Sequence, residues 1–225
     1  MTECVVAGER LVLLPERVAL WPAERTLFVA DFHLGKAASF RSAGIPMPAG
    51  TTTENLGRLD RALAGRPAAH LVILGDFLHS VAARAERTLE RFARWRAGRP
   101  DLAVTLVRGN HDDRAGDPPD VWRMRCVDPG ERLGPFALVH DPAPVAGAYA
   151  LAGHIHPAVR LTERAGQSVR LPCFWFGRSV GVLPSFGAFT GSALVRPRAG
   201  DQVFVVADDE VVHVRGVRHG VGHRV

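Results

Sequence analysis

The first half of the chain alternates short apolar runs with amphipathic segments. Three runs bounded by turn residues predict buried strands, over residues 26–30, 70–74 and 102–107. Upstream of them, residues 10–14 and 17–21 flank Pro15 and predict a strand pair. Between the buried strands, apolar residues at helical spacing predict helices over 51–64, which Thr51–Thr53 would cap, and over 84–97.

The second half has a different pattern. From Phe136 onward, short apolar segments such as FALVH, YALAG, AVRLT, SVRL, CFWF, GVL, QVFVV and VVHV are separated by turn residues. A strand–helix half followed by a strand-rich half predicts an α/β (α+β) fold with mixed sheets and helices outside them. We expect one domain over 1–213 and a basic, glycine-rich tail over 214–225.

Composition narrows the class of protein. The chain has 225 residues, 47% of them hydrophobic and 23% charged, which excludes a disordered chain. Its three cysteines are odd in number and far apart, which indicates reduced thiols rather than a disulfide framework. There is no signal peptide pattern and no apolar run of about 18 residues, so we expect a cytoplasmic protein. The formal charge of +5 comes almost entirely from arginine, which suits a phosphate polymer but also follows from biased codon usage.

Polar residues follow each buried strand at the point where it ends. They are Asp31 and His33 after the first strand, Asp76 and His79 after the second, and Asn110, His111 and Asp112 after the third, with His140, His154 and His156 following later strands. Because ligands bind outside the carboxyl ends of strands in open α/β sheets, we expect these groups to converge. Oxygen and imidazole ligands without thiolates suit Mn, Fe, Zn or Co.

The spacing of these residues predicts two ion sites. Asp31 and His33 lie two residues apart, so on an extended segment they would point the same way and bind one ion. His154 and His156 have the same spacing. Asp76 comes from the central strand, where one carboxylate can bridge two ions about 3.5–4 Å apart. The glycines at 75, 109 and 153 would let the backbone turn tightly beside them.

These motifs resemble a known family. D-x-H, GD-x-x-H, GNHD, a later His and GH-x-H, in this order over residues 31–156, are similar to the calcineurin-like metallophosphoesterase superfamily. That resemblance implies a four-layer fold in which two mixed sheets pack face to face between helices. The stretches DFHLGKAASFRSAGIPMPAGTT, LPCFWF and VLPSFGAFTG also resemble the bacterial PdeM branch, the ligase-associated DNA damage response endonucleases. One departure is Asp141 after His140, where glycine is more usual.

The resemblance implies a role for each site residue. Asp31, His33 and His156 would hold one ion, Asn110, His140 and His154 the other, and Asp76 would bridge them. The two ions, Mn first with Fe, Zn or Co as alternatives, would activate a bridging water as the nucleophile. His111 would stabilise developing charge or protonate the leaving group, and Asp112 would orient its imidazole. His79 would support the bridge or cap a helix.

The sequence identifies residues that contact substrate less clearly than it identifies metal ligands. Lys36, Arg41 and Arg108 lie next to the ligand motifs and are candidates for phosphate contacts, or are solvated surface charges. The Gly/Pro-rich loop over 44–50 is a candidate lip of the pocket. Phe174, Trp175 and Phe176 suit a buried strand better than base stacking.

Three functions are therefore weighed. The first is a phosphodiesterase acting on nucleic acid, with DNA first, associated with repair. The second is a small-molecule phosphohydrolase acting on a cyclic nucleotide, a nucleotide-sugar lipid pyrophosphate or a phosphomonoester. The third is a metal-bound scaffold that recruits a DNA ligase or helicase. Family resemblance alone suggests those repair partners and a homodimer.

Overall fold

The computed structural model describes residues 1–48, 50–162 and 168–214. Its helices are α1 (Lys36–Ser42), α2 (Thr51–Leu63), α3 (Glu86–Ala97) and α4 (Asn110–Ala115), with 3-10 turns η1 (Val81–Arg84) and η2 (Asp120–Trp122). The first sheet contains β1 (Thr2–Val6), β2 (Glu9–Leu14), β3 (Val18–Trp21), β4 (Thr26–Ala30), β5 (His70–Leu74), β6 (Ala103–Val107) and β7 (Arg125–Val127). The second contains β8 (Glu131–Leu133), β9 (Phe136–Leu138), β10 (Tyr149–Ala152), β11 (Pro157–Thr162), β12 (Ser168–Phe176), β13 (Val180–Val182), β14 (Ala193–Leu194), β15 (Gln202–Ala207) and β16 (Glu210–His213).

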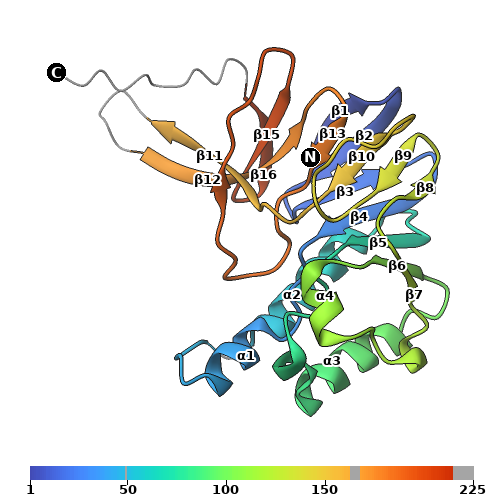
Figure 1. Ribbon diagram of the computed structural model, residues 1–225, viewed down its shortest axis with the longest axis vertical. Coiled ribbons are helices and arrows are strands. Elements are labelled where there is room, and N and C mark those ends of the chain that lie inside the picture. Colours follow the sequence, from blue (N-terminus) through green and yellow to red (C-terminus); the bar gives the residue numbers. More distant parts are fainter. Residues whose placement is uncertain (49, 163–167, 215–225) are drawn as a thin grey trace.

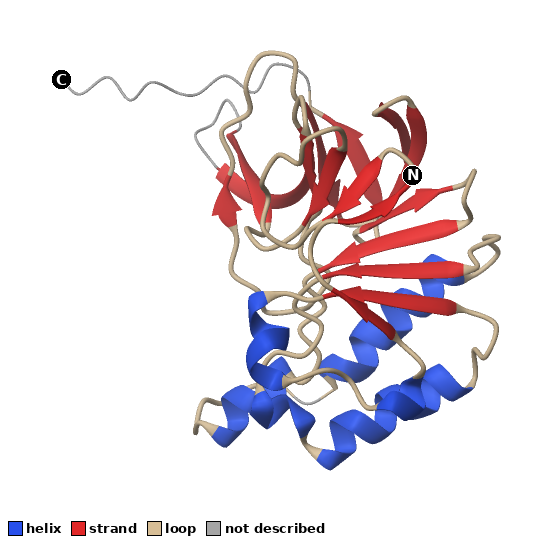
Figure 2. Ribbon diagram, turned by 45° about the vertical axis from the view of Figure 1, so that its right-hand side comes forward, coloured by secondary structure: helices blue, strands red, loops and turns tan. Residues whose placement is uncertain are grey.

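Two mixed sheets pack face to face, as predicted, and the helices cover the outer face of the first sheet (Figure 1). The four α-helices of the described ranges lie together below the first sheet (Figure 2). Alternate residues of β4 divide between two cores: Leu27 and Val29 pack against the helices, whereas Phe28 and Ala30 pack against the second sheet. Burial on both faces explains why residues 27–30 of this strand are all apolar.

The order of the first sheet positions the site. Strands β1 to β4 pair antiparallel, and β4, β5, β6 and β7 pair parallel. In that register Ala30 pairs with Leu74, and Leu74 pairs with Val107. The three segments that follow these residues therefore leave the sheet side by side, at one edge.

Some elements differ from the sequence prediction. The segments SVRL and CFWF form one strand, β12, which passes through Pro172 without a break. Phe174 and Phe176 are buried within it, so the buried-strand interpretation is confirmed. Helix α2 begins after Gly50, which has a left-handed conformation, and no threonine side chain caps it. The short helix α1 was not predicted, because its seven residues bury only Ala37 and give no clear helical period.

Other expectations have mixed outcomes. All three cysteines are free thiols, and burial raises the pKa of Cys4 and Cys173 to about 12. The predicted tail over 214–225 lies outside the described residues from 215 onward. Across the described ranges, the helices are too short or too polar to cross a membrane.

Candidate active site

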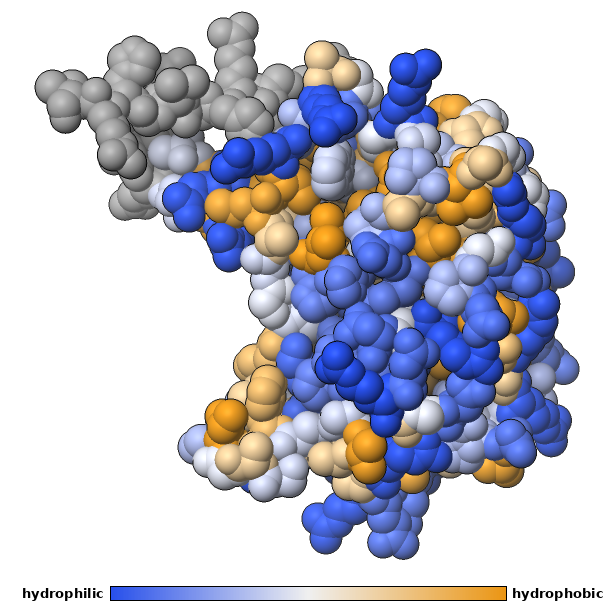
Figure 3. Space-filling model, viewed as in Figure 1, coloured by the Kyte–Doolittle hydropathy of each residue, from blue (hydrophilic) through white to orange (hydrophobic). Residues whose placement is uncertain are grey.

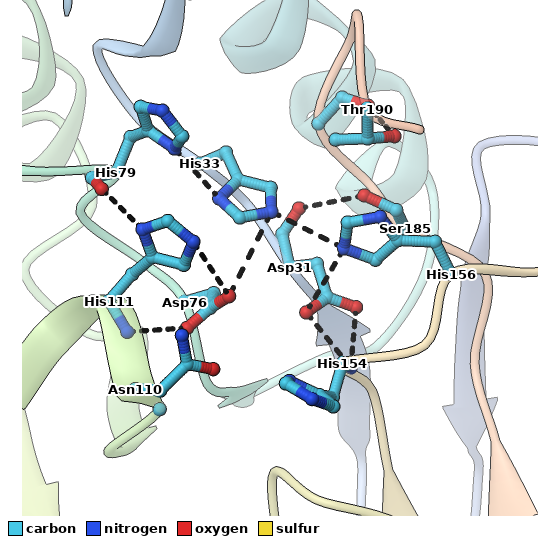
Figure 4. A network of polar contacts seen from close by, with 12 residues as sticks. Asp31, His33, Asp76, His79, Asn110, His111, His154, His156, Ser185 and Thr190 are labelled. Carbon is cyan, nitrogen blue, oxygen red and sulfur yellow. Dashed lines mark hydrogen bonds and ion pairs between the residues drawn. The ribbon is translucent and has the colours of Figure 1, made fainter. Parts of the chain in front are cut away.

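The predicted side chains meet at the carboxyl edge of β4, β5 and β6 (Figure 4). The backbone conformation there differs from the prediction. Asp31 and His33 have φ of 54° and 49°, and His154 and His156 have φ of 70° and 49°, so neither pair lies on an extended segment. Asp76 is also left-handed, at 52°. Because this conformation costs a residue with a side chain about 1–2 kcal/mol, the surrounding fold must hold these five residues in place.

One group of donors contains Asp31, His33 and His156. Nε2 of His156 lies 3.3 Å from Nε2 of His33 and 3.6 Å from Oδ1 of Asp31. Nδ1 of His156 donates a hydrogen bond to the carbonyl oxygen of Gly191 at 3.0 Å. Its Nε2 is therefore the atom that faces the group and can bind a metal ion. Burial, with the cation of Lys36 adding to it, holds the pKa of His33 far below its usual value, so its imidazole is neutral.

A second group surrounds His140. Its Nε2 lies 3.1 Å from Oδ1 of Asn110, 3.1 Å from Nδ1 of His154 and 3.3 Å from Oδ1 of Asp76. Its Nδ1 donates to the carbonyl oxygen of Leu74 at 3.0 Å, so Nε2 is the ring atom that faces these groups. An amide oxygen, a carboxylate oxygen and two imidazole nitrogens that converge in this way form a ligand set that suits a divalent cation.

Asp76 connects the two groups. Its Oδ1 faces Nε2 of His140, and its Oδ2 lies 3.9 Å from Nε2 of His33. The side chain is almost fully buried, and the described residues place no arginine or lysine in an ion pair with it. Two buried carboxylates, four imidazoles and an amide oxygen, arranged around one shared carboxylate, fit a pair of divalent transition-metal ions.

Three glycines make this packing possible. A Cβ atom at Gly75 would lie 2.1 Å from Nδ1 of His140, and one at Gly109 would lie 2.5 Å from Oδ1 of Asp76. A Cβ at Gly153 would lie 2.7 Å from Oδ2 of Asp31. The backbone of each thus approaches a site residue more closely than any side chain allows.

His111 lies at the edge of the site, next to His79 (Figure 4). Its backbone N–H donates to Oδ1 of Asp76, and its Nδ1 lies 2.5 Å from the carbonyl oxygen of His79. The two rings stack with centroids 4.8 Å apart. Nδ1 of His79 also lies 3.4 Å from Nδ1 of His33. His79 therefore contacts both His33 and His111 and caps no helix.

The expectation for Asp112 needs correction. Its carboxylate accepts the backbone N–H groups of Phe77, Leu78 and Gly109, at 2.9–3.2 Å, and is buried. The group that orients the imidazole of His111 is instead the carbonyl of His79. Asp112 supports the site by joining the segments that follow β5 and β6.

The three candidate substrate contacts are placed differently from one another. Lys36 is half-buried at the start of α1, with its Nζ 5.9 Å from the centre of the Phe40 ring. Burial lowers its pKa, and the charges of Asp76 and Asp31 partly oppose that shift. Arg41 is exposed and contacts the carbonyl oxygens of Met47 and Pro48, which holds the predicted lip loop. Arg108 is engaged by Asp117 and Asp128 at 2.7–2.8 Å, so its guanidinium is neutralised rather than directed to substrate.

Sequence reasoning missed the segment that follows β13. Ser185 forms a parallel bridge with Ala30. Its Oγ and the backbone N–H of Gly187 both donate to the carbonyl oxygen of Asp31, at 3.2 and 3.0 Å. The stretch VLPSFGAFTG contributed only to the family resemblance, since serine and glycine carry no metal-ligand signal.

Comparisons with known proteins agree with this geometry. Residues 24–176, more than half of the chain, match the calcineurin-like phosphoesterase family. The crystal structure of the Pseudomonas putida nuclease MPE is 40% identical in sequence, with a TM-score of 0.84, over 95% of this chain and 99% of that one. A comparison with curated proteins finds no match. The chain therefore belongs to the calcineurin-like phosphoesterase family, whose members hydrolyse phosphoesters at a dinuclear metal site.

Proposed function

We propose that this phosphoesterase is a nuclease that hydrolyses phosphodiester bonds of DNA with two Mn²⁺ ions. The observation that carries the proposal is the placement of Asp76, whose two oxygens face separate donor groups. Asp31, His33 and His156 would hold one ion, and Asn110, His140 and His154 the other. When bound, the ions supply a Lewis acid for the phosphate oxygens and an activated water. The likeness to a nuclease supports nucleic acid as the substrate.

The role of His111 follows from its contacts. The carbonyl oxygen of His79 fixes a proton on Nδ1, so Nε2 is the atom that can exchange a proton with substrate. Nε2 lies 3.8 Å from Oδ2 of Asp76, beside the metal-ligand groups, and the side chain is partly exposed to solvent. A protonated Nε2 would donate to the oxygen that leaves phosphorus. Lys36, on the same side of the site as His79, would bind a phosphate oxygen of the substrate.

The first experiment compares bis-p-nitrophenyl phosphate with p-nitrophenyl phosphate, and then single-stranded with double-stranded DNA, in Mn²⁺. The proposal expects diester turnover and DNA cleavage, both lost in Asp76→Asn. His111→Gln should lower DNA cleavage by roughly 10²–10⁴-fold and spare metal binding. It should affect bis-p-nitrophenyl phosphate less, because p-nitrophenolate leaves without a proton.

Other outcomes identify the alternatives. Preference for the monoester, or diester turnover without DNA cleavage, would indicate a small-molecule phosphohydrolase. Metal binding without turnover on any ester would indicate a scaffold. A role in DNA repair beside a ligase or helicase is part of the proposal. It would be supported if such a protein from the same organism co-purifies with the chain and stimulates cleavage.

A further inference from the structure

A small cavity opens beside His156, on the side of the site away from His111. It has a volume of about 130 Å³, and its lining includes His156, Arg17, Arg170, Ser185, Thr190 and Ser192. Figure 4 shows Ser185 and Thr190 grouped around His156, across the site from His79 and His111. None of the described residues that line the cavity has a carboxylate. Two guanidinium groups and the hydroxyl of Ser192 suit an anion with several oxygens, whereas the hydroxyls of Ser185 and Thr190 donate to backbone carbonyl oxygens.

Arg17 belongs to the tight turn between β2 and β3 and has a positive φ of 64°. Its Nη1 donates to the carbonyl oxygen of Ser185 at 3.2 Å, and no acidic side chain of the described residues pairs with it. Burial and the charge of the neighbouring Arg58 lower its pKa, which Glu54 only partly offsets. Arg17 therefore brings a guanidinium to this wall without a direct carboxylate partner among the described residues, although Glu16, Asp208 and Asp209 line the neighbouring pocket on its other side.

Arg170 lies on β12, directly opposite Arg160 of the antiparallel neighbour β11. Like charges at opposing positions destabilise a strand pair unless an anion lies nearby. Arg170 contacts only the backbone oxygen and the hydroxyl of Ser192, at 3.3 and 3.5 Å, and the described residues give neither arginine a carboxylate partner.

The surface around the cavity is open to a chain-like ligand. Figure 3 shows this side of the molecule hollowed between α1 below and the ribbon of β11 and β12 above. A strand that placed one phosphodiester at the metal-ligand groups and continued toward the cavity would pass His156 and meet Arg170, because both residues line that cavity.

We propose that Arg17 and Arg170 form a subsite that binds the phosphate next to the scissile phosphodiester of a nucleic acid strand. The inference rests on the proposed function. The subsite would favour a polymer over a small diester, because only a polymer has a second phosphate to bind there. The subsite lies on the opposite side of the site from His111. Of the residues assigned to metal binding, only His156 belongs to this side, so the subsite would contribute to substrate affinity and not to protonation of the leaving oxygen.

Binding and cleavage are measured separately to test the subsite. A fluorescent single-stranded oligonucleotide is titrated with protein in EDTA, over a series of salt concentrations, and cleavage is followed in Mn²⁺. Arg170→Ala should weaken binding by on the order of tenfold and reduce the salt slope by roughly 0.7. Arg170→Lys should recover part of both. Arg87→Ala, an exposed arginine on α3, is the matched control and should change neither.

Short substrates show whether the subsite binds a terminal phosphate or only an internal phosphate of a longer strand. The dinucleotide d(TpT) has one phosphodiester, whereas d(pTpT) and d(TpTp) add a terminal phosphate on one side or the other. Wild-type protein should have a lower KM for the one whose added phosphate reaches the subsite, and Arg170→Ala should lose that preference. If all three dinucleotides behave alike but Arg170→Ala still weakens oligonucleotide binding, the subsite takes internal phosphates only.

The two proposals fail in different ways. If wild-type protein binds and cleaves DNA while Arg170→Ala matches it in affinity and salt slope, the subsite is overturned and the nuclease stands. If wild-type protein hydrolyses bis-p-nitrophenyl phosphate but neither binds nor cleaves an oligonucleotide, both are overturned.

Discussion

Oδ1 of Asp112 accepts the backbone N–H of Leu78 at 2.9 Å and so ties the segment after β6 to the segment after β5. Two more backbone N–H groups donate to Oδ2 of the same carboxylate, which is buried. Each segment also supplies a site residue, Asp76 on one and Asn110 on the other. The carboxylate thus fixes their separation without touching the reacting groups.

Asp112→Ala should therefore lower the free energy of unfolding by about 3 kcal/mol, because three buried N–H groups lose their acceptor. Chemical denaturation measures this. Asp113→Ala, at the exposed neighbouring position, should stay within about 0.5 kcal/mol of wild type. Equal effects of the two substitutions would contradict the structural role of Asp112.

Metal addition should stabilise the chain. Mn²⁺ at 100 times its Kd should add about 2.7 kcal/mol to the free energy of unfolding and raise Tm accordingly. Ca²⁺ is the control ion, and it should give little shift because it disfavours four imidazole ligands. Asp76→Asn should remove most of the Mn²⁺ shift. A shift of the same size with both ions would indicate unspecific binding.

Gly75→Ala should reduce Mn²⁺ affinity by roughly 10–100-fold, as does the loss of a group that orients a metal ligand. The added methyl group would displace His140, which lies against it. Gly65→Ala is a matched control, since Gly65 also has a positive φ, of 67°, but its Cβ would meet open space. Both variants carry the backbone cost of about 1–2 kcal/mol, so the difference between them isolates the collision. Calorimetric titration with Mn²⁺ reads it out.

Arg108→Ala should leave oligonucleotide affinity within about twofold of wild type. Its guanidinium is shared between Asp117 and Asp128, and such surface ion pairs contribute about 0–1 kcal/mol. Anisotropy titration compares it directly with Arg170→Ala. A tenfold loss for Arg108→Ala would show that this ion-pair cluster opens to bind phosphate.

Where a polar residue directly follows an apolar run that forms a strand of the parallel sheet, the sequence correctly predicts that it lies at the site. Asp31, Asp76 and Asn110 each follow an apolar run, and parallel pairing of those runs is enough to bring them together. His154 and His156 follow an apolar run of the second half, so the same strand-end pattern grouped them with the site, and the order of motifs in the family assigned each to an ion.

The remaining features depend on contacts between distant parts of the chain. Arg17 and Ser185 are 168 positions apart, and no local pattern predicts that the β2–β3 turn reaches the segment after β13. The family resemblance implied that Asp112 orients His111, whereas its hydrogen bonds go to backbone groups that no sequence motif identifies. The left-handed residues were missed because strand-end spacing was interpreted as extended chain.

Those left-handed residues set a limit on how this protein can be stabilised. Replacing His154, which is exposed at φ 70°, with glycine would relieve about 1 kcal/mol of backbone strain while deleting one donor. Selection for heat resistance alone would favour that substitution. The selected variants would be stable but would have lost a metal ligand and, with it, activity. Thermostability screens on this scaffold therefore need a turnover readout in the same round.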